Sequence, residues 1–182
     1  MTKVVVLVGS LRKESFSRKV ALALAELTPG LTFDFADIGS VSHFNQDLEA
    51  TPPADWTAFR DKIAAADAVL FVTAEYNRSV PGVLKNALDV GSRPYGKGVL
   101  IGKPAAVIST SIGAIGGFGA NHHLRQSLVF LNMPTMEQPE AYIGGTSNLF
   151  DPSGQLTNDT TREFLVAFGN AFAQFIETNK KR

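Results

Sequence analysis

Short apolar runs recur along the chain, and segments with helical spacing of apolar residues lie between them. The runs cover residues 3–9, 32–36, 68–73, 104–109 and 134–138. The first, third and fourth are nearly continuous instead of alternating with polar positions, which is typical of strands covered on both faces. Five strands alternating with helices predict a parallel sheet with right-handed crossovers, which is a doubly wound α/β domain.

Apolar residues three or four positions apart predict helices in the intervening segments. The spacing holds over residues 16–27, 84–88, 124–131 and 164–175. In the last of these, phenylalanines at 164, 168, 172 and 175 form a stripe, and such a stripe usually faces the core. Residues 144–158, with a turn from Asp151 to Gly154, predict a surface loop before that helix.

Composition limits the chemistry. With 182 residues, 45% of them apolar, the chain predicts one domain spanning residues 1–182. Lys plus Arg equal Asp plus Glu at 17 each, so we expect neither a nucleic-acid nor a membrane partner. No cysteine is present, which excludes disulfides, thiolate metal sites and cysteine nucleophiles. Redox chemistry would therefore need a bound cofactor. No run approaches the roughly 20 apolar residues of a membrane span, and we expect a cytoplasmic protein.

Ligands of open parallel sheets bind beyond the carboxyl ends of the strands, where the strand order reverses. The loop after the first strand offers Ser10, Arg12, Ser15 and Ser17 directly before a helix. A helix start, hydroxyl groups and a guanidinium are parts of phosphate sites, although an ordinary loop with a serine cap would read the same way. No Gly-x-Gly-x-x-Gly follows this strand and no Gly-x-x-x-x-Gly-Lys-Ser/Thr occurs, so neither a dinucleotide site nor a P-loop is supported.

The loop after the third strand places Glu75, Tyr76, Asn77 and Arg78 in sequence. An aromatic ring can pack against a planar heterocycle, while an amide and backbone groups can pair with its polar edge. The alternative is a surface charge at Glu75 and a simple helix cap at Ser79. The glycines of residues 113–117 permit close approach of the backbone to a ligand, or only a flexible turn.

His122 and His123 are adjacent, so on a helix their side chains point roughly 100° apart. They cannot share a metal ion in the way that residues four apart do, and we expect a structural role and no metal site. Nothing links either histidine to a particular serine or carboxylate. A hydrolytic triad is therefore not predicted.

Three motifs, taken in order, resemble the NADPH-dependent FMN reductase family, and within it the soluble quinone and chromate reductases. They cover residues 9–17, 75–89 and 111–117. The resemblance implies a flavodoxin-like fold with strand order 2-1-3-4-5 and non-covalent FMN. It also implies ping-pong hydride transfer from NADPH or NADH through FMN to a quinone, chromate or another small acceptor. Because the flavin carries the chemistry, no catalytic side chain is expected.

The resemblance also assigns residues by position. It assigns the FMN phosphate to Ser10, Arg12, Ser15, Phe16 and Ser17. It assigns the isoalloxazine ring to Glu75, Tyr76, Asn77 and Arg78, with Ser111 from the third loop. Two positions depart from the family pattern: Ala74 stands where proline is usual, and Arg78 where tyrosine is frequent. The first would loosen a turn, and the second would change the preference for acceptors.

The family further implies a homodimer or tetramer with flavin sites near subunit edges. Val129 and Phe130 add apolar surface beyond one sheet contact, and Arg125 and Glu140 are either contacts between subunits or solvated charges. Two alternatives remain: a flavodoxin-type electron carrier, and a flavin-binding regulatory protein whose reductase activity is incidental. The neutral charge balance argues against the carrier, because such carriers resemble strongly acidic proteins.

Overall fold

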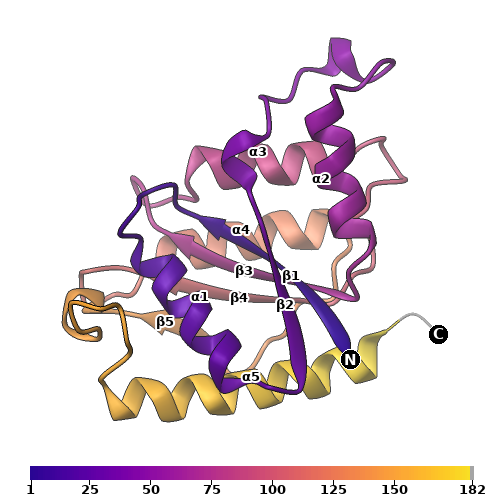
Figure 1. The fold of residues 1–182 in the computed structure, drawn as a ribbon. Helices are drawn as coiled ribbons and strands as arrows, with labels where there is room; N and C mark the ends of the chain where they lie inside the picture. Colours follow the sequence, from indigo (N-terminus) through magenta and orange to yellow (C-terminus); the bar gives the residue numbers. More distant parts are fainter. Residues whose placement is uncertain (181–182) are drawn as a thin grey trace.

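A five-stranded parallel sheet forms the centre of the structure, a computed structural model that describes residues 1–180 (Figure 1). The strands are β1 (Thr2–Gly9), β2 (Leu31–Ala36), β3 (Ala68–Ala74), β4 (Ala105–Thr110) and β5 (Ala141–Ile143). Their order in the sheet is β2-β1-β3-β4-β5, and every pairing is parallel. This confirms the doubly wound, flavodoxin-like fold and its strand order.

Helices cover both faces of the sheet (Figure 1). One layer contains α1 (Phe16–Leu27) and α5 (Asp159–Asn179), and the other contains α2 (Ala54–Ala64), α3 (Gly82–Gly91) and α4 (Phe118–Phe130). In β1, Val4 and Val6 pack towards the first layer, while Val5 and Leu7 pack towards the second. Burial on both faces explains why the central strands are continuously apolar.

Two predictions about the elements need correction. The fifth strand is not residues 134–138: there, only Thr135 makes an isolated bridge to Ala105, and the strand lies at Ala141–Ile143. Pro134 and Pro139 bound the predicted segment, and proline has no N–H to donate to a ladder. Helix α2 has no predicted counterpart, although its buried residues Trp56, Phe59 and Ile63 have helical spacing.

The phenylalanine stripe of α5 has the predicted core role, since Phe168 and Phe172 are fully buried. The loop of residues 144–158, which was predicted to lie at the surface, is partly buried. It contains the short 3-10 helix η3 (Thr146–Asn148), and Leu149 and Leu156 insert into the core. Within residues 1–180, no helix is long and apolar enough to cross a membrane.

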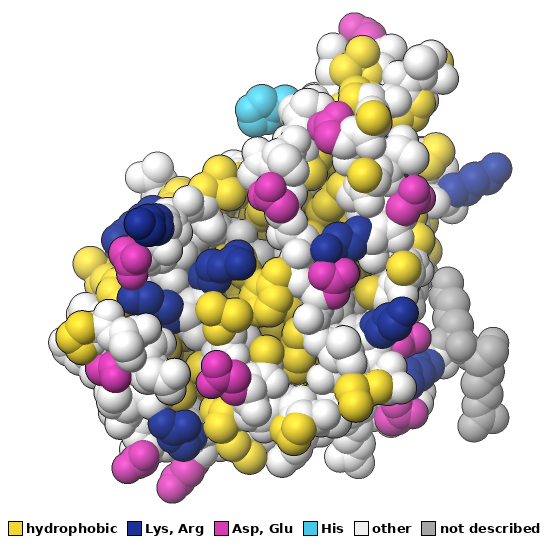
Figure 2. Space-filling model, in the orientation of Figure 1, with side chains coloured by type: hydrophobic (Ala, Val, Ile, Leu, Met, Phe, Trp, Pro, Cys, Tyr) yellow, Lys and Arg dark blue, Asp and Glu magenta, His cyan; other side chains and the backbone are white. Residues whose placement is uncertain are grey.

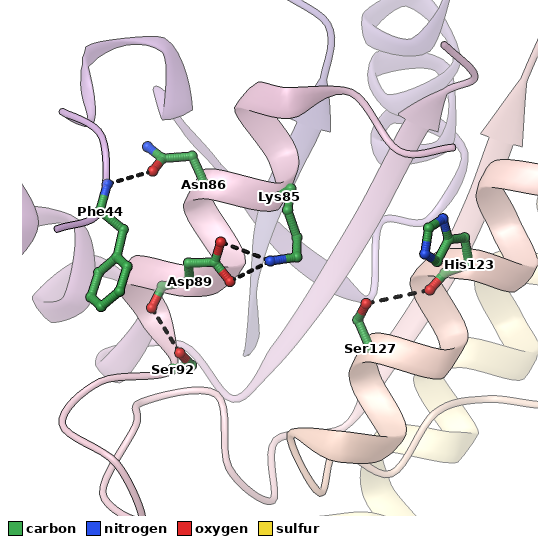
Figure 3. Close-up of polar contacts among 7 residues, drawn as sticks. All are labelled: Phe44, Lys85, Asn86, Asp89, Ser92, His123 and Ser127. Atoms are coloured by element: carbon green, nitrogen blue, oxygen red, sulfur yellow. Dashed lines mark hydrogen bonds and ion pairs between the residues drawn. The ribbon is translucent and has the colours of Figure 1, made fainter. Parts of the chain in front are cut away.

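A projecting arm follows β2 and contains the 3-10 helices η1 (Ile38–Ser40) and η2 (Gln46–Leu48) (Figure 1). Asn86 of α3 holds the base of the arm: its amide donates to the carbonyls of Val41 and Ser42 and accepts from the N–H of Phe44 at 2.8 Å (Figure 3). Asn86 is buried, so these bonds satisfy polar atoms that would otherwise be costly.

Candidate functional site

Three loops meet at the carboxyl edge of the sheet. Gly9 of β1 pairs with Thr73 of β3, and Ala74 of β3 pairs with Thr110 of β4. The three strands therefore end at the same level, and the loops that follow them are neighbours in space. This is the edge at which the sequence predicts a ligand.

The first loop leads into the N-terminus of α1. Ser15 is the helix cap, and its hydroxyl accepts the N–H of Arg18 at 3.2 Å. Within residues 1–180, the backbone N–H groups of Phe16 and Ser17 donate to no other group. Arg12 is exposed and makes no hydrogen bond or ion pair in this part of the chain. An open helix start beside an unpaired guanidinium is suited to binding a phosphate.

The hydroxyl of Ser17 points inward. It lies 2.7 Å from Oγ1 of Thr110, which in turn lies 3.4 Å from the carbonyl oxygen of Thr73. All three residues are buried, so the chain of hydroxyls ties α1 to β4 and β3. Ser17 can therefore bind an anion only through its backbone N–H. Ser10, at the start of the loop, is half-buried.

The second loop is a tight hairpin. Tyr76 and Ser79 exchange both backbone hydrogen bonds at 3.0 Å. Between them, Asn77 and Arg78 have φ angles of 52° and 64°, the left-handed conformation of a type I′ turn. Non-glycine residues seldom adopt this conformation unless their surroundings hold them in it. The ring of Tyr76 is exposed at the site.

Glu75 is neither a free surface charge nor directed into the open edge. Its side chain is only 12% exposed. Oε2 accepts the backbone N–H of Ala120 at the start of α4, and Oε1 accepts from Nη1 of Arg78 at 3.2 Å. Contact between Glu75 and a flavin ring stays a prediction. Because both carboxylate oxygens already accept hydrogen bonds, such a contact would come from the backbone of Glu75.

The third loop depends on glycine. Gly116 has a φ of 65°, and a Cβ at this position would lie 2.5 Å from the carbonyl carbon of Tyr142. Only glycine can therefore pass so close to the strand beside it. Gly117, with a φ of 77°, precedes α4. Ser111 is half-buried, and its hydroxyl accepts the N–H of Gly113 at 3.1 Å.

The two histidines bond neighbouring side chains. His123 Nδ1 lies 2.8 Å from the hydroxyl of Ser79, and His122 Nε2 lies 2.8 Å from the hydroxyl of Tyr142. Burial, together with a hydrogen bond to Glu140, raises the pKa of Tyr142 to about 12. Arg125 bonds internally, to the side chain of Asn121 and the carbonyl of Met136.

Exposed apolar side chains surround the three loops and form what we call the apolar rim. Its members are Leu11, Tyr76, Ile112, Ile115 and Phe118. Only Tyr76 was among the predicted site residues. For Leu11, Ile112 and Ile115 the signal was an apolar residue inside a short loop rich in glycine or serine, where a solvated turn would need none, whereas Phe118 is the first residue of α4. A planar ligand would cover such a rim.

These parts fit FMN. The start of α1 and Arg12 can hold the phosphate, whose two negative charges match the helix dipole and the guanidinium. The apolar rim and the backbone of the hairpin can hold the ring, which has apolar faces and a polar edge. The loops that carry the predicted residues meet at one edge of the sheet, although the side chains of Ser17 and Glu75 turn away from it and the ring of Phe16 packs against Phe150.

Comparison with known proteins agrees with this geometry. Residues 2–148 match the family model described as NADPH-dependent FMN reductase. The chain is 61% identical over 179 residues to a quinone reductase of Pseudomonas putida, covering 97% of this chain and 96% of that one. It is 45% identical over 179 residues to a 2-hydroxy-1,4-benzoquinone reductase of a Burkholderia species, covering 98% of both.

A solved structure is also similar over the whole length. The flavoenzyme NAD(P)H:(acceptor) oxidoreductase FerB of Paracoccus denitrificans superposes with a TM-score of 0.93 at 42% identity, and the match covers 100% of both chains. The matched segment includes all three loops of the site. The chain therefore belongs to the NADPH-dependent FMN reductase family and is an NAD(P)H-dependent FMN oxidoreductase.

Proposed function

We propose that the enzyme reduces small quinones at the carboxyl edge of its sheet, with FMN bound across the three loops. The observation that carries this proposal is the apolar rim, because exposed apolar side chains occur in all three loops that follow β1, β3 and β4. A quinone is planar and largely apolar, and so matches such a surface. Two relatives of high identity that are named for quinone reduction support the same acceptor.

FMN supplies the redox chemistry when bound, accepting a hydride and returning two electrons to the acceptor. The protein residues bind and orient. Arg12 and the N–H groups at the start of α1 fix the phosphate, and the hairpin of residues 76–79 fixes the position of the ring. Leu11, Ile112 and Phe118 exclude water from its surroundings. Donor and acceptor then bind in turn at the same open side, which predicts ping-pong kinetics.

Steady-state kinetics test this function. The purified yellow protein is assayed with NADH and with NADPH, each against a neutral benzoquinone, chromate and oxygen. We expect parallel double-reciprocal lines and the highest kcat/KM with the quinone. Reduction of the flavin by NAD(P)H without quinone turnover would instead indicate an electron carrier or a regulatory protein.

We also propose that the enzyme is a homo-oligomer, joined through a groove between α3 and α4. This groove has a volume of about 520 Å³, and its lining includes Leu88, Tyr95 and Phe130. Tyr95 and Phe130 are each 77% exposed, which is unusual for large apolar side chains on a lone chain. The lining also carries Lys85 and Asp89, which pair at 2.6 Å on α3 (Figure 3).

A second copy is the occupant that these charges favour. Both signs occur in one groove, so two copies related by a two-fold axis can place each charge opposite its complement. On the face drawn in Figure 2, acidic and basic side chains are interspersed and form no patch of one sign. The net charge of zero agrees.

A further inference from the structure

Helix α4 begins without a cap of its own. Its N-cap residue is Gly117, which makes no side-chain hydrogen bond, and its first turn contains no acidic residue. By contrast, Ser15 caps α1 and Asn158 caps α5. The first N–H groups of a helix need partners from outside it. In α4 one partner comes from Glu75, 45 residues earlier, whose Oε2 lies 3.0 Å from the backbone N of Ala120.

The hairpin of residues 76–79 approaches this helix start very closely. A Cβ at Gly119 would lie 3.0 Å from Oε2 of Glu75 and 3.0 Å from the carbonyl oxygen of Arg78. A larger residue at 119 would require these neighbours to give way by a few tenths of an ångström. The absence of a side chain at this position thus permits the capping contact.

A second contact fixes the other end of the hairpin to the same helix. The hydroxyl of Ser79 lies 2.8 Å from Nδ1 of His123. His123 follows Ala120 by three positions, so both contacts lie on one side of α4. The residues between them, Asn77 and Arg78, have left-handed backbone that needs support from outside the turn.

We infer that Glu75 and His123 are positioning residues that lock the ring-facing hairpin onto α4. The inference rests on the proposed function only in assigning the hairpin to the flavin ring. The carboxylate of Glu75 holds the hairpin by accepting hydrogen bonds from the start of α4 and from Arg78. The groups that the hairpin presents to the ring are its backbone and the side chains of Tyr76 and Asn77. Loss of the lock should therefore weaken binding of the ring and leave the phosphate contacts unchanged.

Flavin affinity distinguishes this role. Dissociation constants of FMN and riboflavin are measured from flavin fluorescence for full-length wild type, Glu75→Ala, Glu75→Gln and Glu163→Ala, an exposed glutamate on α5 that serves as the matched control. We expect Glu75→Ala to weaken both flavins by the same factor, about tenfold. Glu75→Gln keeps an acceptor oxygen for Ala120 and should recover most of the affinity, while Glu163→Ala changes nothing. Loss of FMN affinity alone, or equal losses in Gln and Ala, would overturn the inference.

Amide hydrogen exchange tests the lock without any flavin. In Glu75→Ala the N–H of Ala120 should exchange faster than in wild type, and in Ser79→Ala the exchange of residues 76–79 should rise. The N–H groups at the start of α1 should not change in either variant. Unchanged exchange at both places would refute the lock. Failure of quinone turnover with these exchange effects intact would instead count against the proposed function alone.

Discussion

Arg12 stands exposed beside the start of α1, with no hydrogen bond or ion pair inside the described chain to hold its guanidinium. The guanidinium of Arg12 should therefore contribute binding free energy only when an anion such as a phosphate is bound. We expect Arg12→Ala to weaken FMN by about tenfold or more, because a charge-assisted hydrogen bond contributes roughly 1.5–3 kcal/mol. Riboflavin, which has no phosphate, should bind almost unchanged. Fluorescence titration with both flavins checks this, and equal losses would assign Arg12 to the fold or to the ring.

Arg78 is one of the two positions at which the resemblance predicts a departure from the usual family pattern. Its side chain is 75% exposed and pairs with Glu75 at 3.2 Å, so most of its surface lies in solvent. An exposed ion pair of this kind contributes little to stability. The consequence of Arg78 should therefore be found in the binding of charged substrates.

We expect Arg78→Tyr to raise KM for NADPH or an anionic acceptor, because it removes a cation that pairs with phosphate but keeps a stacking surface. The kcat/KM for a neutral benzoquinone should stay within a few-fold. The charge effect should fade with salt, since the Debye length falls from roughly 10 Å at 0.1 M to about 3 Å at 1 M. Steady-state kinetics at two ionic strengths provide the measurement, with Arg78→Lys as a control that keeps the charge. Equal, salt-independent losses for charged and neutral substrates would mean a structural role.

Among the elements, the projecting arm between β2 and α2 depends most on single polar contacts. Asp55, in the first turn of α2, accepts hydrogen bonds from the backbone N–H and the hydroxyl of Ser42 at 2.6 and 2.7 Å. Trp56 donates its ring N–H to the carbonyl of Ser42, and Asn86 holds the same segment from α3. Hydrogen bonds at its base thus anchor the arm, together with Ile38 and Val41, which are buried in the core.

The pKa of Asp55 lies below its ordinary value of 3.8, first because of the backbone N–H of Ser42 and then because of its hydroxyl. A depressed pKa in the folded state stabilises the protein above the unfolded value, and this stabilisation is lost as the pH falls through the folded value. Asp55→Asn should therefore be less stable than wild type at about pH 6, and the difference should shrink towards about pH 3. Urea unfolding at several pH values measures it. Asp61→Asn, on the same helix, is the control, and a constant difference across the range would contradict the assignment.

At the scale of the whole molecule, the prediction concerns the exposed groove between α3 and α4, which we propose is the contact between subunits. If a second copy covers it, Phe130→Asp should dissociate the oligomer, because burying a carboxylate in an apolar contact is costly. Leu22→Asp places the same charge on the partly exposed face of α1 and should leave the assembly intact. Sedimentation velocity at several protein concentrations distinguishes the two. A wild-type monomer, or dissociation by both variants, would contradict the proposed interface.

The sequence by itself determined the fold class and predicted the edge of the sheet at which a ligand should bind. Strands β1, β3 and β4 are buried on both faces, and this leaves a continuous apolar run that needs no knowledge of the neighbours. The role of the first loop as the lead into a capped helix could also be predicted, because a serine cap and an arginine before a helix are local features of the sequence. By contrast, β5 has only three residues, too few to show a period, and α2 was missed although its buried residues have helical spacing.

Only the tertiary structure decided how the loops cooperate. Glu75 stood in a predicted site motif, but its partner Ala120 is 45 positions away, and no local pattern connects a carboxylate to the start of a distant helix. The inward turn of the Ser17 hydroxyl likewise depends on Thr110, which the strand order brings beside α1. The apolar rim arises because three strands end at one level. Spacing along the chain determines which elements form, whereas the contacts of a side chain depend on which elements the sheet places side by side.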